Sequence, residues 1–304
     1  MMTGNTLLRL PVTLISASMG VAGLANGIQA SQVAIFEPLI IPIASLAAFI
    51  LAVMVLSIVA RIAFNAKGLK DEIRVATKRN FLACITITIF LLSGLLSEYE
   101  EYSTALWLAG TAIQLPLLIT ILTWWGISKD KFFIELNPTF LIPPLANVVC
   151  SIFSPIEYIG ISHLMYFTGM LIGVVFYIAI LVKTLQGKTP PVPLYPTFFI
   201  GLATPSMFLL GYLKIVGLND GIAAGMYVWS LLVIVALAIN MKKFEGMKFG
   251  VSTWAFTFPL AAFTTVTYRL GLFTVGHFFL SATCLVVVYV AIKTATNLKI
   301  ILNP

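Results

Sequence analysis

Residues able to perform acid–base, nucleophilic or metal chemistry are few and scattered in this sequence. Cys84, Cys150 and Cys284 fall in separate apolar stretches, without the close spacing of a metal site. Neither a glycine-rich phosphate loop, an HExxH motif nor a pair of carboxylates occurs within the apolar stretches. Because an enzyme site needs titratable groups near its chemistry, the sequence predicts no enzyme, no cofactor and no bound metal.

The two histidines, His163 and His277, stand near one end of their apolar stretches. A histidine within a membrane can relay protons. A lone histidine near the membrane surface is more often simply solvated, and we favour that interpretation here. The relay interpretation stays open, because a proton-coupled transporter would need it.

Proline, glycine, hydroxyl and amide residues instead recur in every second apolar stretch. Proline kinks a helix, and such breaks persist in membranes where protein or water satisfies the freed backbone groups. The residues of this kind that we take as pore-lining candidates are Ser16, Gly20, Thr86, Pro143, Asn147, Pro205, Ser206 and Pro259. Pro116, in an even-numbered stretch, is an exception. Tight helix packing favours the same residues, so the pattern fits either a packed interior or an inner ring around a pathway.

The elements that position these residues are apolar helices. The chain has 304 residues, of which 60% are hydrophobic and 10% charged, and its mean hydropathy is +1.04. Soluble domains are typically about 25% charged. Ten candidate spans, none containing Asp, Glu, Lys or Arg, are 10–28, 38–60, 81–97, 106–125, 140–156, 158–182, 194–213, 221–241, 251–268 and 270–292. The predicted fold class is an all-α integral membrane protein, with one transmembrane domain over residues 1–304.

Helices are preferred to a barrel because the runs are continuously apolar, whereas the strands of a barrel would alternate. Crossing a bilayer takes about 20 apolar residues, so 81–97 and 140–156 are short. The first span is longer than a signal-peptide core, and we expect it to stay as a membrane helix.

The basic residues indicate the orientation. With a cytoplasmic N-terminus, all lysines and arginines except Lys214 and Arg269 fall on the cytoplasmic side, as the positive-inside rule requires. We therefore expect a multi-pass protein of the cell (inner or plasma) membrane with both termini in the cytoplasm. The net charge of +7 then needs no nucleic-acid partner. The longest inner connection, 61–80, is basic and partly amphipathic, which suits a topology anchor or a segment on the membrane surface.

Four stretches in order resemble the tellurite-resistance/dicarboxylate transporter family, which includes bacterial TehA and the plant guard-cell slow anion channels. They are LPVTLISASMGVAGL (10–24), NPTFLIPPLAN (137–147), LATPSMFLLGY (202–212) and WAFTFPLAA (254–262), which resemble the family's first, fifth, seventh and ninth helices. The resemblance runs the whole length of the chain. One departure is the third helix, where CITIT (84–88) lacks the proline of TehA-like members, so the pore width at that level stays open.

The resemblance implies five helical hairpins around a central pore in each subunit, with odd helices inside and even helices outside. It also implies a homotrimer surrounded by membrane lipid, and passive conduction of small inorganic anions such as chloride, nitrate and larger halides. In the family a phenylalanine of the ninth helix plugs the pore, and that position matches Phe258. Phe256, two residues away, would face elsewhere. The neighbours on the face of Phe258 are Trp254, Ala255, Ala261, Ala262 and Thr265, of which we take Ala255, Ala262 and Thr265 as pore-lining candidates.

A pore without fixed charge would hold anions weakly enough to release them, with hydroxyls, amides and helix dipoles giving the attraction. It would compensate poorly for lost hydration, so we expect nitrate and larger halides to pass better than chloride. Two other functions stay open. One is a proton-coupled dicarboxylate (malate) carrier or tellurite-related efflux protein, which would need His163 or His277 as relay. The other is a membrane scaffold, which would carry no ion flux.

Overall fold

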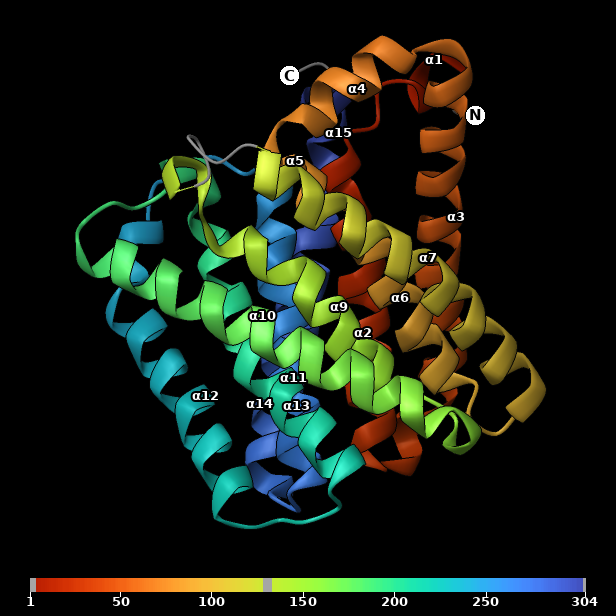
Figure 1. The fold of residues 1–304 in the computed structure, drawn as a ribbon, viewed down its shortest axis with the longest axis vertical. Coiled ribbons are helices and arrows are strands. Elements are labelled where there is room, and N and C mark those ends of the chain that lie inside the picture. Colours follow the sequence, from red (N-terminus) through yellow and green to blue (C-terminus); the bar gives the residue numbers. More distant parts are fainter. Residues whose placement is uncertain (1–3, 128–132, 303–304) are drawn as a thin grey trace.

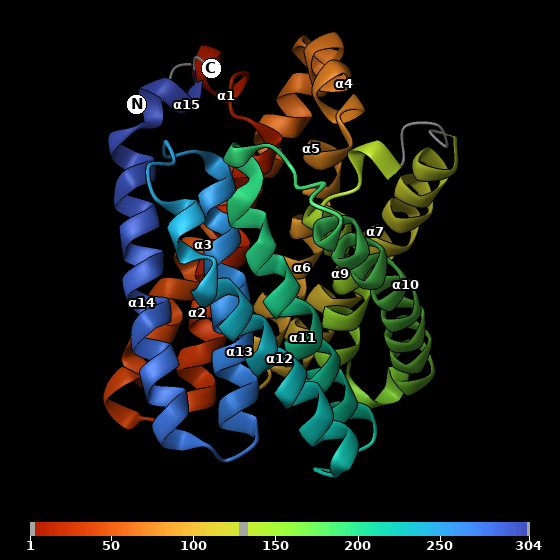
Figure 2. The same cartoon turned by 90° about the vertical axis from the view of Figure 1, so that its left-hand side faces the viewer.

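The computed structural model describes residues 4–127 and 133–302, which form helices joined by short turns (Figures 1 and 2). The long helices are α2 (Ser16–Ser31), α3 (Ile40–Phe64), α6 (Ala83–Leu95), α7 (Glu100–Ile127), α9 (Ile142–Ile152), α10 (Ile159–Leu185), α11 (Ile200–Ile215), α12 (Gly221–Ile239), α13 (Thr257–Arg269) and α14 (Phe273–Thr296). Short helices α1 (Gly4–Leu7), α4 (Ala66–Arg74), α5 (Ala76–Asn80) and α15 (Leu298–Leu302) lie at the end of the molecule that holds both chain termini.

Five of the described helices contact one another in a closed cycle: α2 contacts α6, α6 contacts α9, α9 contacts α11, α11 contacts α13, and α13 contacts α2. We call these the inner helices. Each of the outer helices α3, α7, α10, α12 and α14 packs against the inner helix that precedes it in the chain. Burial follows the same division, because 89% of the segment around α2 is buried and 11% of that around α3. The apolar surface of the outer helices therefore faces outward, as in a protein surrounded by lipid.

The described residues contain eight helical segments long and apolar enough to cross a membrane. They correspond to eight of the ten predicted spans and make the chain a helical membrane protein. The segment that matches the third predicted span, Ala76–Leu95, begins earlier than that span because α5 leads directly into α6. The fifth, Pro138–Ile152, is apolar but short. The ninth is α13 with the turn before it, a segment that carries five threonines and ends on Arg269.

Most inner helices begin with a 3₁₀ turn rather than a regular α-helical turn. These turns are η1 (Val12–Ile15), η3 (Pro138–Leu141), η5 (Val192–Phe199) and η7 (Val251–Phe256), before α2, α9, α11 and α13. Proline accounts for three of them, with Pro11 before η1, Pro138 opening η3, and Pro193 and Pro196 in η5. Because 3₁₀ hydrogen bonds have poorer geometry, this end of the ring is less regular than the other.

A buried ion pair fixes the connection between α3 and α6 to the start of the first inner helix. Arg61 lies 2.6 Å from the Glu72 carboxylate, and both side chains are almost wholly buried. Glu72 Oε1 also accepts the backbone N–H of Val12 at 3.0 Å, and Arg61 donates to the carbonyl of Leu10 at 3.1 Å. The face of α4 that carries Leu69 and Glu72 therefore packs on protein.

The termini and the predicted cytoplasmic basic residues share one end of the molecule, which we call the basic end. Lys129 and Lys131, which belong to the same predicted set, lie outside the described residues. Lys214 and Arg269 lie in the last turns of α11 and α13, at the opposite end. The inner helices all run from the basic end to this opposite end, because an outer helix returns the chain each time.

Candidate functional site: a passage through the inner ring

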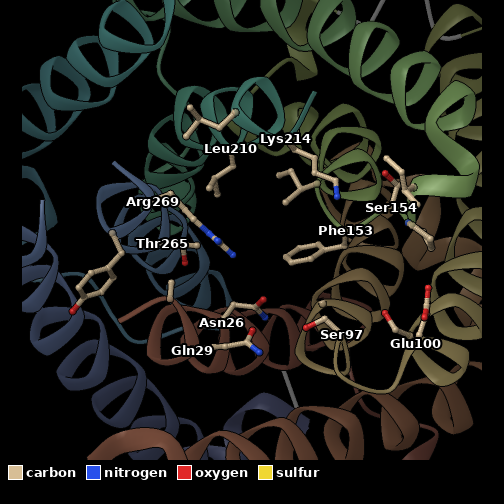
Figure 3. A pocket seen from close by; sticks show the side chains of 18 of the residues that line it. Asn26, Gln29, Ser97, Glu100, Phe153, Ser154, Leu210, Lys214, Thr265 and Arg269 are labelled. Carbon is tan, nitrogen blue, oxygen red and sulfur yellow. The ribbon is translucent and has the colours of Figure 1, made fainter. Parts of the chain in front are cut away.

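A cavity of about 890 Å³ opens at the end opposite the basic end, and we call it the vestibule (Figure 3). All five inner helices contribute to its wall, through residues such as Asn26, Gly94, Ile152, Lys214 and Thr265. The wall carries amides, hydroxyls and charged groups beside apolar side chains. The vestibule therefore lies on the axis of the inner ring and leads into it.

Two cations point into the vestibule from the ends of neighbouring inner helices. Lys214 and Arg269 extend toward its centre, while Glu100 lies at the opposite side (Figure 3). The carboxylate of Glu157 also lines the cavity. The ion pairs found among the described residues, Arg61–Glu72 and Arg74–Asp71, involve neither cation. The helix dipole favours a cation in the last turn of a helix, and both side chains line the cavity that an anion would enter.

Below the vestibule the passage narrows to a gap of about 10 Å³, which we call the outer gap. Asn26, Phe153 and Thr265 line both the vestibule and this gap, so the two adjoin each other. Such a volume is close to the space that one water molecule needs. The rest of its wall is apolar or small, including Gly23 and Ala262.

A second gap of about 10 Å³, the inner gap, lies on the other side of Phe258. Phe258 is the residue that lines both gaps. On four inner helices the residues of the inner gap precede those of the outer gap by one or more turns, as Ser16 precedes Gly23 on the first helix, and on α13 the two sets meet at Phe258. The gaps are therefore stacked along the ring axis with the Phe258 ring between them. Phe258 is 3% exposed.

The Phe258 ring fits because its neighbour on α2 is a glycine. A Cβ added to Gly23 would lie 3.3 Å from Phe258 Cδ2 and 3.1 Å from the Cβ of Ala261. Both distances are tighter than ordinary contact, so a side chain at this position would have to displace the ring or α13. The close approach of α2 and α13 places the aromatic ring across the passage.

Polar groups along the passage donate their hydrogens to nearby carbonyls. Ser16 donates to the carbonyl of Thr13 at 2.7 Å, and Thr265 to that of Ala261 at 2.9 Å. The amide nitrogen of Asn26 donates to Ala22 and Leu91. An anion in the passage would therefore have to compete with these bonds, which makes its binding weaker than to free hydroxyls.

The structure brings six of the residues singled out in the sequence to the passage. Ser16, Ala255, Phe258 and Pro259 line the inner gap, while Ala262 and Thr265 line the outer gap. The two other neighbours of Phe258 named from the sequence differ in position. Ala261 lines the outer gap, whereas Trp254 donates a hydrogen bond to Thr294 of α14.

The remaining candidates lie in contacts between helices. The side chain of Gln114, from outer helix α7, accepts a bond from Thr86 at 2.6 Å and donates to Asn147 at 2.8 Å. It also donates to the carbonyl of Pro143 at 3.2 Å. One outer-helix amide thus ties α6 to α9.

Two further contacts hold the other candidates. Ser206, next to Pro205 in α11, faces Ser230 of α12 with 3.4 Å between the two hydroxyl oxygens. Gly20 abuts Thr257, and a Cβ at Gly20 would collide with that side chain. The residues in these contacts are small or polar as pore-lining residues would be, which is why sequence alone could not separate the two groups.

Neither His163 nor His277 lines the passage. His163 Nδ1 lies 2.7 Å from the carbonyl of Ile159 on its own helix, and the residue is half-buried. His277 Nδ1 lies 2.7 Å from the Tyr268 hydroxyl. Tyr268 lines the vestibule, but neither histidine does.

Among the residues of the passage that sequence reasoning missed are Asn26, Phe153, Lys214 and Arg269. The two cations carried a usable signal, because they were the exceptions to the basic bias and each ends an inner helix. Asn26 and Phe153 carried none, since amides and aromatic residues also occur between packed helices. Phe153 occupies its place because Gly94 leaves room for the ring.

Comparison with known proteins places the chain in a family. The pattern of the family described as voltage-dependent anion channel matches residues 9–295. In Arabidopsis thaliana, the S-type anion channel SLAH3 is 27% identical over 150 residues, 48% of this chain and 23% of the relative. The S-type anion channel SLAH1 of the same organism is 27% identical over 163 residues, which are 52% of this chain and 42% of the relative. Guard cell S-type anion channel SLAC1 is 22% identical over 147 residues, 48% and 26%.

The matched segments span less than half the length of each of these relatives. The family match, in contrast, covers nearly the whole chain and all five inner helices. It confirms the resemblance to the plant slow anion channels that four sequence motifs indicated. The chain belongs to the voltage-dependent anion channel family, whose members are channels and not enzymes.

Proposed function

We propose that this protein is a gated channel that passes small monovalent anions passively through the inner ring of each subunit. The observation that carries the proposal is the alignment of vestibule, outer gap and inner gap on one axis, interrupted by Phe258. Membership of the anion channel family supports the ion class, and the relatives are named S-type anion channels. Phe258 is the gate in this proposal, and the structure corresponds to its closed state.

The proposed basis of anion preference is electrostatic at the mouth and weak within. Lys214 and Arg269 raise the anion concentration in the vestibule, where Glu100 and Glu157 oppose them. The gaps beyond carry no ionisable acid or base, so an anion that enters is not held. An anion that sheds its hydration water easily should cross the gaps more readily, so nitrate and larger halides should be more permeant than chloride.

The orientation and assembly belong to the proposal as well. The basic end faces the cytoplasm of the cell membrane by the positive-inside rule, so the vestibule opens outward. Assembly as a homotrimer follows from the family resemblance drawn from the sequence. Each subunit has its own complete ring, so conduction through one ring needs no group from another.

The competing function is a proton-coupled carrier of dicarboxylates. Such a carrier needs a titratable relay along the path. Among the described residues, the carboxylates near the path are Glu100 and Glu157 at the open vestibule, and both histidines lie off it. The geometry therefore favours the channel.

The experiment is anion current across planar bilayers that contain purified protein, with nitrate, bromide and chloride in turn. Wild type should be nearly silent, and Phe258→Ala should carry a large anion-selective current with nitrate above chloride. The matched control is Phe256→Ala. That ring packs 4.6 Å from the ring of Phe199, between ring centroids, and lies outside the passage.

If the Phe258→Ala protein folds but carries no current, the assignment of Phe258 as the gate would be rejected. Silence of every variant, with proton-dependent dicarboxylate uptake instead, would remove the channel.

A further inference from the structure

A second large cavity lies outside the inner ring, between the outer helices α10 and α12. It has a volume of about 440 Å³ and is lined mostly by apolar and aromatic side chains. The size is within the range of small-molecule sites in proteins. We call it the lateral groove. Helix α12 stands at the periphery of the bundle, so the groove borders the surroundings of the protein (Figure 1).

One end of the lateral groove is closed by two aromatic rings. Tyr177 of α10 and Trp229 of α12 meet edge to face, with 4.8 Å between ring centroids. From there the wall on α12 follows one helical stripe as far as Asn240. That stripe is about 16 Å long at the rise of an α-helix. This is about half of the ~30 Å hydrocarbon core, the depth of a single leaflet.

The other end of the groove is polar and lies at the basic end of the molecule. Asn240, Tyr195 and Lys243 line it there. Lys243 is exposed, and it takes part in neither of the ion pairs found in the part of the chain that the structure describes. A cation at the mouth of an apolar slot suits a ligand with a negative head and a hydrocarbon tail.

The floor of the groove is built from the broken starts of two inner helices. Pro138 and Leu141 belong to η3, and Phe198 and Gly201 belong to the junction of η5 with α11. Anything in the groove therefore packs against the irregular turns that open the fifth and seventh spans. These turns have few regular hydrogen bonds of their own, so added packing would steady them.

We propose that the lateral groove binds one anionic phospholipid, with an acyl chain between α10 and α12 and the phosphate near Lys243. The apolar wall, the depth of one leaflet and the cation Lys243 at the mouth all point to this chemistry. A helix from a second copy of the chain does not fit as well. Its diameter is about 10 Å, and the Tyr177–Trp229 contact closes the slot before such a rod could pass.

The test is native mass spectrometry of the protein released from detergent micelles containing phosphatidylglycerol or phosphatidylcholine. Wild type should retain one phosphatidylglycerol, about fivefold more than phosphatidylcholine for the contribution of one lysine. Ala236→Trp fills the groove from α12 and should abolish retention. Ala238→Trp is the matched control, since Ala238 is exposed on the same helix outside the groove.

A second pair of variants separates head-group recognition from folding. Lys243→Gln should lose the preference for phosphatidylglycerol, whereas Lys242→Gln, exposed beside it and outside the groove, should keep it. Bound wild type should also unfold at a higher temperature than delipidated protein, and Ala236→Trp should not show this shift.

Equal retention by Ala236→Trp and Ala238→Trp would overturn the site. Equal retention of both lipids by wild type would overturn the anionic head group. Disulfide-linked dimers of Ala236→Cys in membranes, without lipid retention by wild type, would show a second chain in the groove instead.

Discussion

The passage is asymmetric about Phe258. On one side a gap of about 10 Å³ adjoins an open vestibule of about 890 Å³ that carries two cations, whereas on the other side a gap of about 10 Å³ is bounded by packed side chains. The open side is formed by the last turns of the inner helices and the tight side mainly by their first two turns, which follow 3₁₀ segments in four of the five helices. The difference indicates that an ion enters the vestibule freely and is stopped at the outer gap and the Phe258 ring. Opening must therefore widen the two gaps beside the ring, and not the vestibule.

The largest effect should come from refilling an emptied gate. In a Phe258→Ala channel, Gly23→Leu places a new side chain where the ring was, because the position faces both Phe258 and Ala261. We expect the current of Phe258→Ala to fall more than about tenfold, equivalent to 1.4 kcal/mol. Bilayer current checks it, with thermal unfolding to confirm that the double variant folds. An undiminished current would place the restriction elsewhere.

The next effect concerns the tight side, which the buried ion pair braces. Glu72→Gln leaves the Arg61 charge buried without its partner, so the free energy of unfolding should fall by about 3 kcal/mol. Asp71→Asn is the matched control, because its pair with Arg74 is largely exposed and worth at most about 0.5 kcal/mol. Denaturation in mild detergent measures both. Equal losses of unfolding free energy for the two variants would mean that the buried Arg61–Glu72 pair contributes no more to stability than the exposed Arg74–Asp71 pair.

A smaller effect should appear on the open side. Lys214→Gln combined with Arg269→Gln lowers the anion concentration in the vestibule, and we expect about a threefold smaller open-channel current at low salt. At 1 M salt the difference should vanish, because the Debye length is then about 3 Å. The test background is Phe258→Ala, which carries current. A loss that persists at high salt would mean that the cations act by structure and not by field.

The smallest effect lies at the turn between α11 and α12. Asp220 caps α12 by accepting the N–H groups of Ile222 and Ala223. The Tyr212 hydroxyl and these amides hold the pKa of Asp220 below its ordinary value. A lowered pKa means that the stabilisation is present at neutral pH and is lost as the pH falls through the lowered pKa of the folded state.

Asp220→Asn should therefore lower the unfolding temperature slightly at pH 7, and the gap from wild type should close on acidification. Unfolding temperatures of the two proteins between pH 3 and pH 7 check this. A gap independent of pH would show that the carboxylate charge is immaterial at this cap.

The sequence predicted the elements well and their interior contacts poorly. Continuous apolar runs specify membrane helices because the bilayer demands them, and the positions of eight spans follow directly. Proline and hydroxyl residues marked alternate helices, but that pattern fitted a packed interior as well as an inner ring. Gln114 shows the limit, since an amide in an outer helix looked unremarkable until α6 and α9 supplied its partners Thr86 and Asn147. Candidates in lateral contacts and in the passage share composition, so the geometry of five packed helices was needed to separate them.

The measurement that tests the central claim most directly is thiol labelling from the vestibule side, with a small anionic reagent on cells or sealed vesicles. Thr265→Cys, which the reagent meets before it reaches Phe258, should react rapidly. Ala255→Cys, which lines the inner gap, should be protected and become reactive when combined with Phe258→Ala. Equal labelling of Ala255→Cys with and without the Phe258 ring would contradict the account, because the passage would then be closed by something other than Phe258.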